Sequence, residues 1–139
     1  MAHLRVRLQG GRLDIVNIPI LKIENFLIAS VQVALYDMQA IQFKDAVLQK
    51  IYETKAKGVI IDLTAMDVLD SFVGRLISDI AAMARLMGTT VVITGLQPAV
   101  AITLVELGLE LPGVTTALNL EKGIAKLRLI TENNADGNA

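Results

Sequence analysis

The chain has 139 residues, which is enough for one domain with a single hydrophobic core. It contains no cysteine, which excludes disulfides and thiolate metal sites. Its one histidine, His3, makes a histidine-centred catalytic triad or a zinc site very improbable. The 13 basic and 14 acidic residues form no basic block, and no apolar run is long enough to span a membrane. The first residues also lack the apolar region of a signal peptide, so we expect a cytoplasmic protein that binds neither nucleic acid nor membrane and has no cofactor.

The apolar content of the chain is high. Hydrophobic residues make up 53% and charged residues 19% of the chain, against a typical charged share of about 25%. In a small domain part of this apolar content reaches the surface, where contiguous apolar area usually marks an interface. We favour association with another chain, and the alternative is a core rich in alanine and valine.

The N-terminal part of the chain predicts strands. Apolar and polar residues alternate within residues 1–17, which favours either an edge hairpin or a partly ordered arm. Residues 19–23 and 26–33 are expected to form two further strands, joined by a tight turn as a hairpin.

The middle of the chain predicts a helix, a buried strand and a second helix. The first helix is expected over residues 38–57, with Asp37 as its N-cap and Gly58 as its stop. The continuous apolar run at 59–63 is typical of a buried strand, and the helix after it is expected over residues 71–87.

The C-terminal part predicts a strand at 89–94 and a helix at 98–107 that begins with Pro98. This helix is apolar nearly all round, which predicts burial on most sides, one of them against another chain. A short strand at 114–117 and a helix from Asn119 to about residue 130 follow, and the polar residues 131–139 are expected to be a disordered tail.

This order of elements predicts the α/β class. Strands that alternate with helices indicate one mixed, mainly parallel sheet with about four helices packed on it. We assign residues 18–130 to this single domain, residues 1–17 to the N-terminal arm or hairpin, and residues 131–139 to the tail. Sites in such sheets lie beyond the carboxyl ends of the strands.

One connection lies at such a position and contains several polar residues. It follows the strand that ends near Asp62, carries Thr64, Asp67 and Asp70, and leads to Ser71 at the start of a helix. A metal site on the aspartates is less favoured, because turn and helix-start aspartates are common for capping alone. An anion site before the Pro98 helix is an alternative, although such a turn is more often only structural.

Ser71 has two interpretations. Serine is a favoured N-cap, and most serines at helix starts do only that. As a nucleophile Ser71 has no histidine partner, so a hydrolase is disfavoured and we expect no enzyme activity. As a phosphoacceptor it is physically reasonable, because the helix dipole and the free N–H groups of a first turn accommodate a phosphate.

The segments DLTAMDVLDSFVGRL and VVITGLQPAVAITLVELGL resemble the STAS family, the sulfate-transporter and anti-sigma-factor-antagonist domains. The segments IPILKI and QKIYET extend the similarity, which covers about Ile18 to Leu127. Within the family, the chain most resembles the small scaffold subunits of the bacterial stressosome. The resemblance implies that Ser71 matches the phosphorylated serine of the family. It also suggests a partner-facing surface formed by Thr64, Asp67, Asp70, Phe72 and Arg75.

The resemblance implies three kinds of partner. These are RsbR-like STAS sensor proteins that join the chain in a large shell, an RsbT-like serine kinase that the shell sequesters until phosphorylation releases it, and a PP2C-like phosphatase. The sensors use an additional regulatory threonine, for which Thr64, Thr94 and Thr103 are the nearby candidates. The rival hypotheses are a simple anti-sigma-factor antagonist without a shell and a STAS module that binds a small anion or nucleotide.

Overall fold

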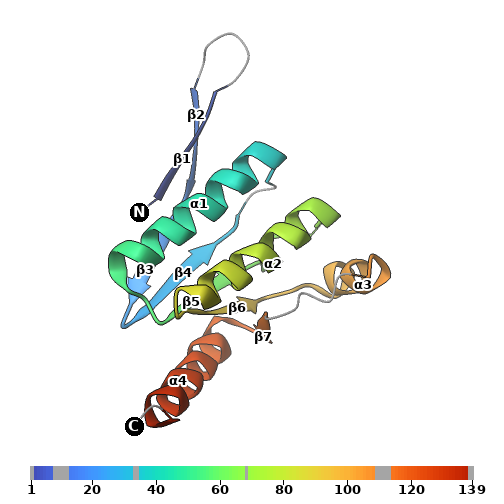
Figure 1. Ribbon diagram of the computed structural model, residues 1–139. Helices are drawn as coiled ribbons and strands as arrows, with labels where there is room; N and C mark the ends of the chain where they lie inside the picture. The colour runs from blue at the N-terminus through green and yellow to red at the C-terminus, as the bar shows by residue number, and fades with distance from the viewer. Residues whose placement is uncertain (1, 8–12, 33–34, 68, 109–113, 138–139) are drawn as a thin grey trace.

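The computed structural model describes residues 2–7, 13–32, 35–67, 69–108 and 114–137, and its main feature is a five-stranded sheet in the order β3-β4-β5-β6-β7 (Figure 1). β3 (Ile20–Ile23) pairs antiparallel with β4 (Phe26–Ser30), as predicted for the hairpin. β4, β5 (Gly58–Asp62), β6 (Thr90–Thr94) and β7 (Thr115–Ala117) are parallel to one another. The predicted α/β class with a mixed, mainly parallel sheet is confirmed.

Helices cover both faces of this sheet. α1 (Asp37–Thr54) and α2 (Ser71–Leu86) lie on one face, and α4 (Leu120–Gly137) lies on the other (Figure 1). α3 (Pro98–Glu106) lies apart from these layers, beyond the carboxyl end of β6. Because the central strands are covered on both sides, they are apolar throughout rather than alternating.

The two faces have separate cores. The larger one joins buried side chains of α1 and α2, such as Phe43, Val47 and Ile80, to Val59 and Ile61 of the sheet. The smaller one, under α4, consists of Phe26, Ile28, Ile60, Val92 and Leu127.

An ion pair joins the β3–β4 turn to α4. Arg128 donates hydrogen bonds of 2.8 and 3.1 Å to the Glu24 carboxylate, and these bonds hold the pKa of Glu24 below its ordinary value. The stabilisation is therefore present above the ordinary glutamate pKa and is lost as the pH falls through the lowered value. Both side chains are exposed, so the contribution is small.

The N-terminal residues form a hairpin. β1 (Ala2–Arg7) and β2 (Leu13–Ile18) pair antiparallel as a two-stranded sheet of their own. β1 contacts α1 (Figure 1). Of the two alternatives for this segment the structure has the hairpin, and it does not form an edge of the five-stranded sheet.

The predicted caps of α1 were wrong. The N-cap is Tyr36, whose backbone N–H donates to the Gln39 side chain at 3.1 Å, and Asp37 is the first helical residue. The helix ends at Thr54 because Lys55 adopts a left-handed conformation with φ of 57° and closes the last turn with an N–H bond to Ile51.

Gly58, the expected stop of that helix, instead begins β5. A Cβ atom at this position would lie 2.7 Å from Leu127 Cδ2, so the glycine allows α4 to approach the sheet closely.

Two further helices differ from what the sequence predicted. Residues 131–139 were expected to be disordered, but α4 continues to Gly137, and residues 138–139 lie outside the described ranges. Extending an existing helix adds a hydrogen bond for each residue fixed, and the Thr131 hydroxyl also donates to the Leu127 carbonyl at 2.8 Å. α3 was expected to be buried on most sides, one of them against another chain. Within the chain only Val100 and Leu104 are buried, because this helix meets the rest of the domain with one side only.

Candidate functional site

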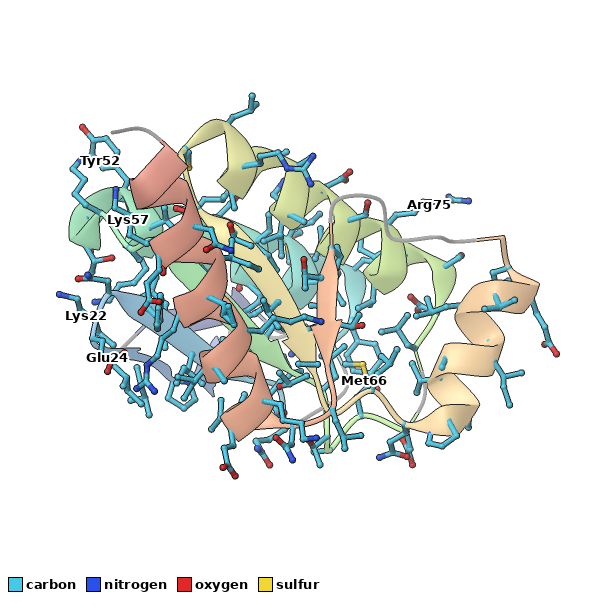
Figure 2. All side chains as sticks on the ribbon, turned by 90° about the horizontal axis from the view of Figure 1, so that it is seen from below. Lys22, Glu24, Tyr52, Lys57, Met66 and Arg75 are labelled. Atoms are coloured by element: carbon cyan, nitrogen blue, oxygen red, sulfur yellow. The ribbon has the colours of Figure 1, made fainter. Side chains whose placement is uncertain are left out.

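The candidate segment connects β5 to α2 at the carboxyl edge of the sheet. Three apolar side chains of this connection, Leu63, Met66 and Leu69, are buried in the larger core. Figure 2 shows Met66 near the ends of the strands, and it shows Arg75 extending from α2 away from the sheet. The connection is therefore held in place by these three buried side chains, and its polar residues remain at the surface.

Asp70, not Ser71, is the N-cap of α2. The Asp70 Oδ1 atom accepts a hydrogen bond of 2.8 Å from the Val73 backbone N–H, and Ser71 is the first helical residue. Within the described ranges the half-buried Ser71 hydroxyl has no hydrogen-bond partner. The capping interpretation of Ser71 is therefore wrong, and its hydroxyl is left available for another role.

Replacing Asp70 with alanine is expected to lower the free energy of unfolding by about 1 kcal/mol, because the first turn of α2 loses its cap. Asp67→Ala is the matched control, since Asp67 is an exposed aspartate of the same connection that caps no helix. Urea denaturation of both variants measures the difference. Equal losses of stability in the two variants would contradict the capping role.

A polar network lies at the carboxyl ends of β5 and β6. Asp62 Oδ1 accepts hydrogen bonds from the hydroxyls of Thr94, at 2.7 Å, and Thr64, at 3.0 Å. Thr94 is fully buried. The network is possible because Asp62 and Thr94 are paired in the parallel register of the two strands.

The network also ties the connection before α2 to the one before α3. The Gln97 side chain donates a 2.7 Å hydrogen bond to the Thr64 carbonyl. Gly95 adopts φ of +71°, and a Cβ on it would lie 1.9 Å from the Thr64 hydroxyl oxygen. Only glycine therefore allows the two connections to approach this closely.

The structure brings most of the predicted site residues together. Asp67, Asp70, Ser71, Phe72 and Arg75 belong to one connection and the first turns of α2, and all but the half-buried Ser71 are exposed. Thr64 is exposed as well, but its hydroxyl is committed to Asp62. That these residues bind a partner remains a prediction.

The sequence interpretation missed the roles of Asp62 and Gln97 and left Thr94 as one of three threonine candidates. Thr94 is buried and bonded to Asp62, and the Thr103 hydroxyl donates to the Ala99 carbonyl at 2.9 Å. The Thr-Gly-Leu-Gln-Pro turn was the available signal, but it does not reveal which strand end lies opposite.

Two further features of this edge are its carboxylates and a cavity near α4. Among the described residues no three His, Asp or Glu side chains come together as metal ligands, and Asp62 and Asp70 are already used by the network and the cap. A cavity of about 690 Å³ lies between Leu96, the end of β7 and the start of α4, beside rather than at the N-terminus of α3.

Comparison with known proteins gives the family. The STAS domain model matches residues 17–122, which include the whole β3–β7 sheet and the Ser71 connection. The chain belongs to the STAS family. The predicted resemblance is thus confirmed over most of the chain.

Two solved structures are similar to this STAS chain over nearly their full lengths. A Moorella thermoacetica RsbS variant, in which one serine is replaced by glutamate, is 43% identical with a TM-score of 0.75, and the match covers 84% of this chain and 99% of that one. A chain from a structure described as the molecular architecture of the stressosome is 45% identical with a TM-score of 0.72, covering 81% and 98%. This STAS domain is therefore of the RsbS type found in stressosome proteins.

A curated relative of greater length is also similar to this chain. The RsbT co-antagonist protein RsbRA of Bacillus subtilis is 28% identical over 120 residues, which is 86% of this chain and 44% of the relative. The STAS chain thus spans less than half the length of that protein. Among the described residues, no helix has both the length and the apolar character needed to cross a bilayer.

Proposed function

We propose that this STAS protein is a stressosome scaffold and a phosphorylation-switched antagonist that acts in the cytoplasm and has no enzyme activity of its own. It would sequester an RsbT-like serine kinase and release it when Ser71 is phosphorylated, and a PP2C-like phosphatase would restore the binding state. RsbR-like STAS sensors would share the assembly. The observation that carries the proposal is the Ser71 hydroxyl. It stands at the start of α2 and has no hydrogen-bond partner among the described residues, because Asp70 caps the helix.

The charges around Ser71 suit a switch. A phosphate adds about -1.5 to -2 charges at pH 7, and the N-terminal dipole of α2 favours it. The exposed carboxylates of Asp67 and Asp70 oppose it, while Arg75, one turn further on, offsets part of the charge. Phosphorylation therefore changes what this surface binds more than it changes the stability of the fold.

The other serines are less suitable acceptors. The chain has three serines. The Ser30 hydroxyl accepts a 2.6 Å hydrogen bond from the Gln32 side chain, and the half-buried Ser78 lies in the middle of α2, where no free helix terminus stabilises a phosphate. The serine-to-glutamate variant of the Moorella relative places a fixed negative charge at one serine and so supports a serine-based switch.

The relatives support the choice of kinase. RsbRA and RsbRD of Bacillus subtilis are both named RsbT co-antagonists, so a chain of the same family is expected to face the same partner. The exposed residues beside Ser71 combine an aromatic ring, Phe72, with charges of both signs, Asp67 and Arg75. Such a mixed surface, changed by one phosphate, is suited to reversible binding.

Incubation of the protein with an RsbT-type kinase and ATP is expected to add one phosphate, on Ser71, as mapped by mass spectrometry. Ser71→Ala is expected to remain unmodified, while the control Ser78→Ala is modified at the wild-type rate. In a pull-down, the unmodified protein is expected to retain the kinase and Ser71→Glu to lose it, because the carboxylate supplies part of the phosphate charge.

Phosphorylation of Ser71→Ala at the wild-type rate would overturn the role of this serine. Equal retention of the kinase by the wild type and Ser71→Glu would overturn the release step. The rival, a simple antagonist without a shell, uses the same serine and differs only in the size of its assembly.

A further inference from the structure

α3 presents an apolar surface that the domain does not cover. Ile102 and Val105 are 58% and 78% exposed, and Leu107 directly after the helix is also exposed. Glu106 is the one charged residue of this helix. The α3 surface, defined by Ile102, Val105, Glu106 and Leu107, is therefore an apolar knob with a single negative charge.

The opposite end of the domain has a hollow of complementary character. A cavity of about 310 Å³ lies where α1 and α2 end, and it is lined by Ile51, Tyr52, Lys55, Ala56, Lys57, Met87 and Gly88. Both charged residues of the lining are lysines. The Lys55 Nζ atom lies 4.3 Å from the centre of the Tyr52 ring, which holds this charge beside the cavity.

The end of α2 that leads into this hollow through Met87 is apolar as well. Leu86, the last residue of α2, is 89% exposed, and Met83 and Met87 are partly exposed beside it in sequence. Methionine side chains adapt to irregular partners, and exposed apolar area of this kind marks an interface. We call the cavity and Leu86 the lysine hollow.

The α3 surface and the lysine hollow lie at opposite ends of the molecule. In Figure 2, Tyr52 and Lys57 are at one end, beside the ends of β3 and β4, and the α3 ribbon is at the other. The two surfaces cannot meet within one chain. Two chains can bring them together in a head-to-tail arrangement.

We propose that the α3 surface of one copy docks into the lysine hollow of the next copy. Ile102, Val105 and Leu107 would cover the exposed ring and methionine side chains, and the Glu106 carboxylate would pair with Lys55 and Lys57. The proposal rests on the assembly part of the proposed function and names its contact. Because the two surfaces differ, the contact is heterologous and leaves one surface free on each terminal copy. It therefore propagates into a ring if the rotation between copies closes, and into a filament if it does not.

A second copy of the chain is the occupant that the charges favour. The charged residues that line the hollow are both lysines, and the same chain carries an apolar helix whose single carboxylate, Glu106, forms no ion pair with any described residue. A contact of this size is weak alone, but closure of a ring or shell makes many such contacts act together. The Ser71 surface takes no part in it.

Charge reversal tests the pairing in the full-length protein. Analytical ultracentrifugation of the wild type is expected to show concentration-dependent assembly, and Glu106→Lys and the double variant Lys55→Glu/Lys57→Glu are each expected to lower the association constant at least about tenfold. An equimolar mixture of these two variants is expected to recover assembly, because each surface then meets a partner of opposite charge. Glu121→Lys and Lys122→Glu, which are exposed on α4, are the controls and should assemble as the wild type does.

A wild type that stays monomeric at all concentrations, or a Glu106→Lys variant that assembles normally, would overturn the proposal. So would two defective variants whose mixture does not assemble. Circular dichroism checks that each variant folds. Mass spectrometry of Ser71 in Glu106→Lys separates the two proposals, since failure of the contact leaves phosphorylation of Ser71 unchanged and failure of the phosphorylation leaves assembly unchanged.

Discussion

Replacing Leu127 with alanine is expected to lower the free energy of unfolding by about 3 kcal/mol, within the range of roughly 2–5 kcal/mol for such truncations. Leu127 is fully buried and lies in the small core under α4 with Phe26, Ile28, Ile60 and Val92. This core is small, so few neighbouring side chains are available to fill the cavity. Gly58 adds to the effect, because its missing Cβ leaves a gap that the Leu127 side chain occupies.

Leu129→Ala is the matched control for this prediction. The same substitution on the same helix removes a side chain that is 58% exposed, and it is expected to change stability by less than about 0.5 kcal/mol. Urea unfolding followed by circular dichroism measures both variants. A similar loss of stability in both would show that α4 does not pack on the sheet through Leu127.

Replacing Gly95 with alanine is expected to lower the free energy of unfolding by about 2–4 kcal/mol. The left-handed backbone costs an alanine about 1–2 kcal/mol, and the added Cβ would overlap the Thr64 hydroxyl oxygen at 1.9 Å. Displacing Thr64 breaks its hydrogen bond to Asp62 and adds the cost of overpacking, about 1–3 kcal/mol. The Ser71 connection is expected to move with Thr64.

Gly108→Ala separates the two causes. Gly108 has nearly the same φ, +70°, but a Cβ on it would meet no atom of the described, non-adjacent residues within 4 Å, so we expect only the backbone cost. Thermal unfolding of both variants gives the difference, and the rate of Ser71 phosphorylation reports whether the connection has moved. Equal effects of the two substitutions would show that Thr64 does not press against Gly95.

Local patterns predicted most of the elements correctly. Pro98 is the first residue of α3, and the Asn119 side chain accepts a 2.9 Å hydrogen bond from Lys122 N–H at the start of α4, both as expected. The N-cap residue of a helix was harder to predict where two candidate residues are adjacent. Tyr36 precedes Asp37 and Asp70 precedes Ser71, and a shift of one residue changes which side chain is free.

Fold class and family, together with the position of Ser71 at a strand-to-helix connection, were determined by the sequence alone, because apolar periodicity and the STAS segments are local features of the chain. The tertiary structure decided two other things. It joined Asp62 to Thr94, which are 32 residues apart, through the parallel register of β5 and β6. It also decided that α3 is exposed, because burial depends on what packs beside a helix, and the domain covers α3 on one side only.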